Sequence, residues 1–590
     1  MGKINLIRIS KNLLIMGVFC VTCQISAQQD ASFVPCQVMP DLMTKYNADH
    51  DALVRFYSPA SRGYYGRTFD AGGSPERRIR MSELRKDYLS KLSKIDFEGL
   101  PQECKVDYIL FKRDLEKEVA AAVEKEAIYQ KIKPWFTFSD KIYPYLKARR
   151  RGHQPDATKM AEEWNEVVTQ IEVLKTKLEA TASMDKDEVA EALLVIGDLK
   201  SSAENVYTFY NGYDPMFTWW MPKVYEAMTA SLDQYAATFE KKVEKGKAVD
   251  ESGIVGVPAG RDELMKQLEY EMIPYTPEQL IEIANKEFAW CDEELLKASR
   301  EMGFGDDWKA AQEKVKNSYV EPGKQPEMIL RLYNESVDFL KKNDLITVPP
   351  LAEEVWGMIM MTPERQLVNP FFTGGSSISI SYPTDDMEYE QRMMSMRGNN
   401  PHFSRATVHH ELIAGHNLQG FMNSRYRTYR NYRTPFWTEG WALYWELLLW
   451  DMDFPQGPED RIGMLFWHMH RCARIIFSLN YHLGKWTPQE CIDFLVDRVG
   501  FERANAEGEV RRSFVGNYPP LYQLAYLTGG RQFYALHKEM VESGKMTNKE
   551  FHDTIMQLNA MPVEMIRAIM TDQKLRKNYK TKWKFYDTEK

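Results

Sequence analysis

The chain has 590 residues, of which 44% are hydrophobic, 12% are aromatic and 27% are charged. This composition can bury a substantial core, and it excludes a disordered tail or a low-complexity scaffold. The net charge of −8 gives no general attraction to nucleic acid, so no nucleic-acid partner is expected.

The first element expected is a secretory signal over residues 1–27. Three basic residues precede the apolar stretch LLIMGVFCVTC, and small and polar residues follow it up to Ala27. The stretch is too short to be a stable membrane anchor. A lipoprotein signal needs a leucine-like residue three positions before the modified cysteine, and neither Cys20 nor Cys23 has one. We expect cleavage near Ala27 and an exported protein, periplasmic or extracellular.

The cysteines that remain after this cleavage are few and scattered. They are Cys36, Cys104, Cys291, Cys472 and Cys491. Their odd number and irregular spacing predict neither a disulfide framework nor a cysteine zinc site.

Amphipathic helices are predicted along most of the chain. The segments DATKMAEEWNEVVTQIEVLKTKLEATASM and DKDEVAEALLVIGDLKSSAENVYTFY place apolar residues three and four apart, with charges between them. We expect a helical region over 28–330 and a metal-binding helical region over 331–590. Because no long linker separates them, they are expected to form one continuous unit.

One short strand is predicted in the second region. In SSISISYP, small polar residues alternate with isoleucine, as on a half-exposed strand. We expect Ser379, Ser381 and Tyr382 to form a sheet edge that binds an extended peptide substrate. A purely structural hairpin is the alternative.

Four of the eleven histidines are gathered within fifteen residues. The run from His410 to His416 is close to the zinc pattern H-E-x-x-H, but its second histidine comes two residues late. On a regular helix these two side chains would point roughly 120° apart. The pair His409 and His416 would lie about 10.5 Å apart along the axis, too far for one ion. A shared metal requires a helix break after Glu411, where Gly415 tolerates unusual backbone angles. A chance cluster on a solvated helix is the alternative.

A later helix carries two isolated carboxylates. Thr434 and Pro435 are suited to begin a helix, and between Phe436 and Trp450 only Glu439 and Glu446 are ionisable. A buried carboxylate without a partner is costly, so each needs a cation or a strong hydrogen bond.

These segments resemble the bacterial domain-of-unknown-function family 885, a group similar to helical zinc peptidases. The family signature H-E-x-x-P-G-H-x-x-Q is matched at His410, Glu411, Gly415, His416 and Gln419, and Ala414 replaces its proline. The string EGWALYWE resembles the family's E-G-W-A-L-Y-x-E. The patches around His482 and from Glu509 to Tyr526 also resemble family segments, although Ser478 stands where aspartate is common.

The resemblance implies a mainly α fold of zinc-peptidase-like (zincin) architecture, with a small β-sheet edge near the active site. His410, His416 and Glu439 are expected to hold one zinc ion per chain, with Glu411 as the general base. Tyr526 or His482 is expected to donate a hydrogen bond to the oxyanion. Supporting positions are expected for Glu446, His409, Gln419 and Arg512. Glu446 is expected to orient a ligand or to pair with Arg474 or Arg512, and direct ligation of the metal by Glu446 is the alternative.

We therefore expect an exported zinc peptidase that hydrolyses small peptides. Two rivals remain. A zinc amidohydrolase or esterase acting on non-peptide substrates would use the same residues. A non-catalytic binding protein with a decayed metal site would explain Ala414 and Ser478.

Overall fold

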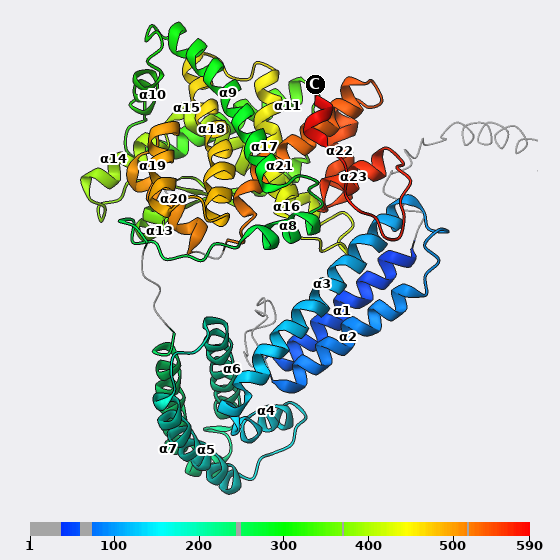
Figure 1. Cartoon of the computed structure of the whole chain (residues 1–590), viewed down its shortest axis with the longest axis vertical. Helices are drawn as coiled ribbons and strands as arrows, with labels where there is room; N and C mark the ends of the chain where they lie inside the picture. The colour runs from blue at the N-terminus through cyan, green and yellow to red at the C-terminus, as the bar shows by residue number, and fades with distance from the viewer. Residues whose placement is uncertain (1–36, 59–73, 244–248, 369–370, 516–517, 590) are drawn as a thin grey trace, which may run out of the picture.

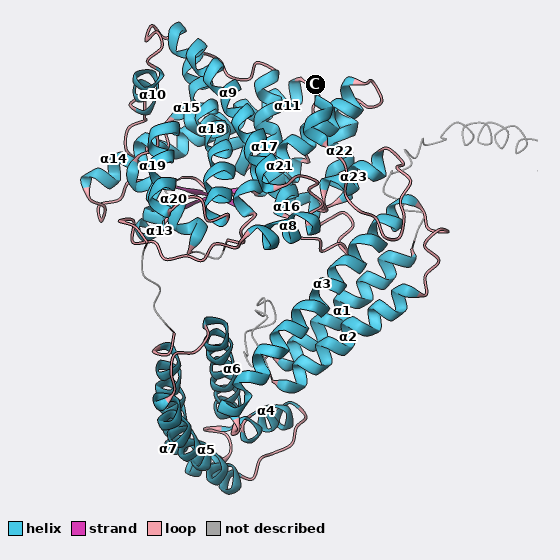
Figure 2. Cartoon of the chain, viewed as in Figure 1, coloured by secondary structure: helices cyan, strands magenta, loops and turns pink. Residues whose placement is uncertain are grey.

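The computed structural model describes residues 37–58, 74–243, 249–368, 371–515 and 518–589. The signal expected over residues 1–27 lies outside this part of the chain. The fold is mainly helical, as predicted, with one two-stranded sheet among the described residues (Figure 2). None of the described helices combines the length and apolar character needed to cross a membrane.

Three long helices form an arm beside the main body (Figure 1). They are α1 (Val38–Tyr57), α2 (Pro75–Ser93) and α3 (Gln102–Ile132). The first half of α3 packs into the core of the main body, whereas Tyr129 and Ile132 at its end belong to a second core. Buried Asp107 of α3 accepts hydrogen bonds from Arg430 Nε at 2.7 Å and Nη2 at 3.0 Å, which tie the arm to the main body.

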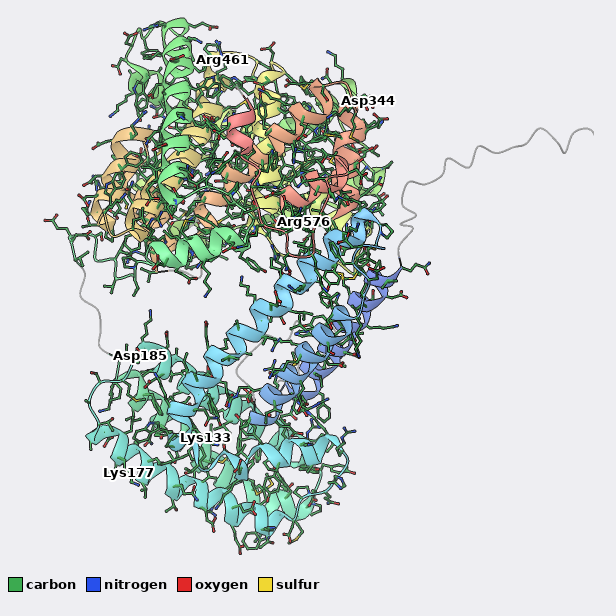
Figure 3. All side chains as sticks on the ribbon, turned by 45° about the vertical axis from the view of Figure 1, so that its right-hand side comes forward. Lys133, Lys177, Asp185, Asp344, Arg461 and Arg576 are labelled. Carbon is green, nitrogen blue, oxygen red and sulfur yellow. The ribbon has the colours of Figure 1, made fainter. Side chains whose placement is uncertain are left out.

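The second core belongs to a small bundle at the far end of the arm (Figure 1). Its helices are α4 (Tyr143–Arg150), α5 (Ala157–Ala180), α6 (Lys186–Tyr210) and α7 (Pro215–Glu240). Asp156, Asp185 and Asp214 cap α5, α6 and α7 by accepting hydrogen bonds from backbone N–H groups. Figure 3 places Lys133 where the arm meets this bundle, and Lys177 and Asp185 within the bundle.

The main body contains the remaining helices and the larger core. The bounds are α8 (Arg261–Tyr270), α9 (Pro277–Glu301), α10 (Trp308–Lys316), α11 (Gln325–Lys342), α12 (Pro350–Val355), α13 (Pro363–Val368), α14 (Tyr389–Gly398), α15 (Pro401–Glu411), α16 (His416–Asn423), α17 (Pro435–Asp451), α18 (Pro458–His482), α19 (Pro488–Val499), α20 (Arg503–Phe514), α21 (Tyr522–His537), α22 (Asn548–Leu558) and α23 (Val563–Met570). Short helical turns cover Lys538–Glu542 and Phe585–Glu589 in this body. Two further short turns, Lys133–Phe136 and Ser139–Lys141, belong to the second core. Asp344, Arg461 and Arg576 lie on the main body (Figure 3).

The larger core extends across residue 330. Helices α9, α10 and α11 precede or reach that point, yet they share one core with α15 to α23. Helix α9 packs along α18, so the segment before residue 330 contributes directly to the metal-binding body. The separate unit is instead the bundle of α4 to α7.

The sheet is small and its second strand is enclosed. Strand β1 (Gly357–Met360) pairs in parallel with β2 (Ser377–Ile380), and Thr373 pairs with Ser379 in an antiparallel bridge. The strand predicted from the alternating pattern is therefore present. Because β2 has backbone partners on both sides, it does not offer the free edge that was expected.

Helices α17 and α21 cross in close backbone contact. A Cβ atom on Gly440 would lie 2.6 Å from both the Cα and the carbonyl carbon of Gly529, so no larger residue fits there without a shift. This crossing fixes Glu439 of α17 against the start of α21, which carries Tyr522 and Tyr526.

One cysteine departs from the expected absence of disulfides. Cys104 is disulfide-bonded, and its partner lies outside the described residues. Cys291, Cys472 and Cys491 are free and buried.

Candidate metal centre

The predicted helix break lies between the two histidines. Helix α15 ends at Glu411 and α16 begins at His416. The Ile413–Ala414 peptide bond within the break is cis. A Cβ atom on Gly415 would overlap the carbonyl oxygen of His410 and lie 2.5 Å from that of His409. Glycine is therefore required at the tightest point of the break.

The break brings the three predicted ligands together. Glu439 Oε2 lies 3.3 Å from His416 Nε2 and 3.6 Å from His410 Nε2. One ligand atom from each residue lies within 4.8 Å of the other two. The two imidazole rings are nearly perpendicular, with centroids 4.9 Å apart. Two imidazole nitrogens and one carboxylate form a donor set found in catalytic zinc sites.

Hydrogen bonds fix which nitrogen of each ring faces the centre. His410 Nδ1 donates to Glu446 Oε1 at 2.7 Å, and His416 Nδ1 donates to Gln419 Oε1 at 2.9 Å. The Gln419 amide is itself oriented by donation to Thr438 O at 3.0 Å. Since both acceptors are oxygens, each Nδ1 carries a proton, and Nε2 is the nitrogen of each ring that a cation would bind by displacing any proton there.

The buried charges at this centre also favour a bound cation. Among the described residues, Glu439 Oε2 is buried and has no hydrogen-bond donor, while Oε1 accepts from Tyr522 Oη at 2.5 Å. Burial opposes the charge of Glu439, but His416 and His410 outweigh it and hold the pKa of Glu439 well below its usual value. Burial likewise opposes a charge on His416, but Glu439 outweighs it and raises the pKa of His416 to about 9. The residues therefore fit a divalent ion such as Zn²⁺.

Glu411 lies beside His410, His416 and Glu439 in the same cavity but is not a member of that candidate ligand group. Burial raises the pKa of its carboxyl group, and the backbone N–H of Gly374 hydrogen bonds to it. A Cβ atom on Gly374 would lie 2.7 Å from Glu411 Cβ and closer still to its carboxylate, so this segment packs directly over the glutamate. A raised pKa suits a group that takes and returns a proton.

These residues line one cavity of about 240 Å³. Its lining includes all three ligands, Glu411, Glu446, Arg512 and Tyr526. The Tyr526 ring is nearly parallel to the His410 ring, with centroids 6.2 Å apart, and burial raises the pKa of Tyr526, which keeps its hydroxyl protonated as a donor. Larger cavities lie elsewhere, one of about 760 Å³ against α2 and α3, but they do not contain these ligands.

Comparison with known proteins identifies the family. The sequence profile of the family described as "Bacterial protein of unknown function (DUF885)" matches residues 60–570. The chain belongs to this family. No curated protein matches the chain.

Two solved structures resemble the fold of this family member. One is described as a "putative lipoprotein of unknown function" from Shewanella oneidensis, with a TM-score of 0.62, 16% identity and coverage of 91% of this chain and 100% of that chain. The other is a "putative lipoprotein" from Colwellia psychrerythraea, with a TM-score of 0.54, 13% identity and coverage of 90% and 98%. At these identities the likeness concerns the fold alone.

Several predicted site residues lie away from the cavity. His482 is not in its lining; its Nδ1 accepts from the backbone N–H of Ala259 at 3.3 Å, and burial lowers its pKa to about 4. His409 is buried beside Phe454, with ring centroids 5.7 Å apart, and is not in the cavity lining. Neither is placed to act as predicted.

The expected peptide-binding strand is also away from the cavity. Ser379 and Ser381 are buried, and Ser381 Oγ donates to Gln366 Oε1 at 3.0 Å. The backbone N–H of Tyr382 donates to the same oxygen at 2.8 Å. Ser381 and Tyr382 thus hold the sheet to α13, while Ser379 pairs with Thr373, and the cavity is lined by the preceding Phe371–Gly374 segment.

Three important residues were not predicted in their roles. Tyr522 binds the ligand Glu439, and Arg471 and Arg474 line the cavity. The spacing of four residues between Tyr522 and Tyr526 puts both on one helix face, which is a usable signal in the sequence. Arg471 was missed because nothing near it in sequence marks its approach to Glu446, where Nη2 lies 3.6 Å from Oε1.

A second group of soft donors lies in the core. Cys291 of α9 meets His468 and Cys472 of α18, with ligand atoms within 4.8 Å of one another, and His468 Nε2 hydrogen bonds to Glu287 Oε2 at 3.0 Å. None of the four lines the cavity of the metal centre. Sequence spacing could not reveal this group because its members come from distant helices.

Proposed function

We propose that this protein is an exported zinc peptidase that hydrolyses small peptides. The observation that carries the proposal is the convergence of the buried Glu439 Oε2 on the Nε2 atoms of His410 and His416, 3.6 Å and 3.3 Å away. His410, His416 and Glu439 would hold one zinc ion per chain. Zinc in such a site supplies a Lewis acid that polarises a carbonyl group and lowers the pKa of water.

Side chains around the centre would transfer the proton, stabilise the oxyanion and orient the metal ligands. Glu411 accepts a proton from the attacking water and returns it to the leaving amine, for which its raised pKa is suited. Tyr526 donates a hydrogen bond to the oxyanion that forms on the substrate carbonyl. Tyr522 holds Glu439, while Glu446 and Gln419 hold the two imidazoles in orientation.

Two observations support export. The structurally similar proteins are described as lipoproteins, which are exported, and Cys104 is disulfide-bonded, a state that persists in oxidising compartments. The signal peptide proposed for residues 1–27 would direct this export.

The function is tested with a panel of peptides and non-peptide esters and amides. We expect wild type to cleave peptides, a chelator to abolish cleavage, and added zinc to restore it. Glu411→Gln keeps the shape of the side chain but removes the base, so a loss of at least about a hundredfold is expected. Cleavage of esters or simple amides alone would favour the rival hydrolase, and an unaffected Glu411→Gln variant would contradict the assigned base.

A further inference from the structure

Three arginines lie along one wall of the metal cavity. Arg471 and Arg474 project from α18, and Arg512 projects from α20. All three side chains are largely buried. Arginines gathered in a small cavity beside a metal centre need anions to balance them.

The protein supplies fewer carboxylates than guanidinium groups on this wall. Glu509 serves two arginines, since Oε1 accepts from Arg474 Nε at 2.7 Å and Oε2 lies 2.5 Å from Arg512 Nη2. Among the described residues, Arg471 forms an ion pair with Glu446 alone, whose Oε1 lies 3.6 Å from its Nη2, and its Nη1 lies 3.4 Å from the neutral acceptor His470 Nδ1. The same Glu446 oxygen is closer to His410 Nδ1, at 2.7 Å. The negative charge of Glu446 is therefore shared between Arg471 and the candidate ligand His410.

Two hydrogen-bond donors of these arginines also lack an acceptor among the described residues. Among the described residues, the buried Nε atoms of Arg471 and Arg512 have no hydrogen-bond partner. Arg471 is only 6% exposed, so bulk water does not solvate its guanidinium group. Burial lowers the pKa of Arg471, as expected for a cation that has lost water without gaining an equal partner. Guanidinium groups bind planar carboxylates through paired charged hydrogen bonds.

The wall lies at a definite distance from the metal ligands. Tyr526 lies between them: its ring is nearly parallel to that of His410, while the guanidinium carbons of Arg471 and Arg474 lie 4.8 Å and 4.5 Å from the ring centroid. An extended residue spans about 3.5 Å. Arg471 Nη2 also lies 3.6 Å from Glu446 Oε1, which lies 2.7 Å from His410 Nδ1. A group held by Arg471 is therefore one or two residues from a bond at the ligands, and the cavity of about 240 Å³ suits such a short segment.

We propose that Arg471 and Arg512 form a subsite for the C-terminal carboxylate of the peptide substrate. The inference rests on the proposed peptidase function and deepens it. The substrates are peptides with a free carboxyl end, from which the last one or two residues are removed.

Binding without turnover tests this subsite. The Glu411→Gln protein, incubated with zinc, is titrated by calorimetry with a tripeptide carrying a free carboxyl end and with the same tripeptide amidated at that end. We expect the acid to bind roughly tenfold to a hundredfold more tightly than the amide, because a buried charged hydrogen-bond pair is lost. Equal affinities, or binding of neither peptide at millimolar concentration, would overturn the proposal.

Arginine variants then locate the contact. Adding Arg512→Gln should reduce the ratio of acid to amide affinity towards one, and Arg471→Lys should reduce it while keeping a positive charge. Arg498→Gln is the matched control, since Arg498 pairs with Asp292 outside the cavity and should leave the ratio unchanged. A ratio that stays the same in both cavity variants would assign the selectivity to other groups and refute these two arginines. If a variant fails to fold, the comparison of acid and amide in the parent protein still decides the proposal.

The two proposals fail in different ways. A wild-type protein that binds the acid selectively but cleaves nothing would refute the peptidase function and leave the subsite standing. A wild-type protein that cleaves amidated and free peptides equally well would refute the subsite and leave the peptidase function standing.

Discussion

Gly415 packs directly against the backbone carbonyl of His410. A Cβ atom at Gly415 would overlap that oxygen and also lie 2.5 Å from the carbonyl carbon of His410. This contact closes the break between α15 and α16 and so turns two histidines six positions apart towards one point. The candidate metal centre therefore depends on this backbone contact as well as on His410, His416 and Glu439.

Replacing this glycine should disrupt the centre. In Gly415→Ala the added methyl group meets backbone atoms that cannot rotate away, so His410 and His416 must separate. We expect zinc content well below one per chain and a lower unfolding temperature. Gly420→Ala in α16 is the control, because nothing lies within 4 Å of its Cβ position and alanine favours the helix by about 1 kcal/mol. Full zinc content in Gly415→Ala would show that the break does not require glycine.

The hydrogen bond between Glu446 and His410 should control metal affinity. Glu446→Gln weakens the acceptor for His410 Nδ1 while keeping its size, so we expect zinc affinity to fall by about tenfold to a hundredfold. Competition with a chromophoric chelator measures this directly. Gln419→Ala, which removes the neutral partner of His416, should cost less. An order reversed between the two variants would contradict the role assigned to Glu446.

Gly440 and Gly529 at the crossing of α17 and α21 should not be replaceable by larger residues without a loss of stability. In Gly529→Ala the methyl group would overlap the carbonyl oxygen of Phe436, so we expect a loss of about 1–3 kcal/mol in the free energy of unfolding. Because the crossing positions Glu439 against Tyr522, zinc affinity should fall as well. Thermal unfolding with and without zinc measures both effects. A variant as stable as wild type would mean that the helices can separate at little cost.

The distal bundle should lose stability as pH rises. Burial raises the pKa of Asp198 in α6 from 3.8 to about 6. A carboxyl group with a raised folded pKa favours the folded state below its unfolded pKa, and this contribution disappears as pH rises through about 6. Asp198→Asn should therefore stabilise the bundle at pH 8, by at most about 3 kcal/mol, and by only about half as much at pH 5. An equal gain at both pH values would contradict the assignment.

The convergence of the three candidate ligands could be predicted because its constraints are local. Helical geometry alone showed that His410 and His416 could share an ion only across a break, and Gly415 marked its position. Glu439 was identifiable because a carboxylate in an apolar helix needs a partner. The family match over residues 60–570 agrees with the resemblance carried by these segments.

The surroundings of the ligands could not be predicted in the same way. An alternating pattern located β2 but not its neighbours, so Ser379 and Ser381 were expected at a free edge that Thr373 in fact covers. His482 was expected at the cavity from its position in a motif, although its place at the end of α18 directs it towards Ala259. Arg471 and Tyr522 reach the centre through the packing of α18 and α21, which no local pattern encodes.

Metal analysis of the purified protein tests the central claim most directly. Elemental analysis of wild type and of Glu439→Gln, after incubation with zinc and removal of the excess, should give about one zinc per chain in wild type and much less in the variant. Gln at this position keeps the size of the side chain but removes the charge that the two imidazoles face. No zinc in wild type, or the same content in both proteins, would contradict a metal centre formed by His410, His416 and Glu439.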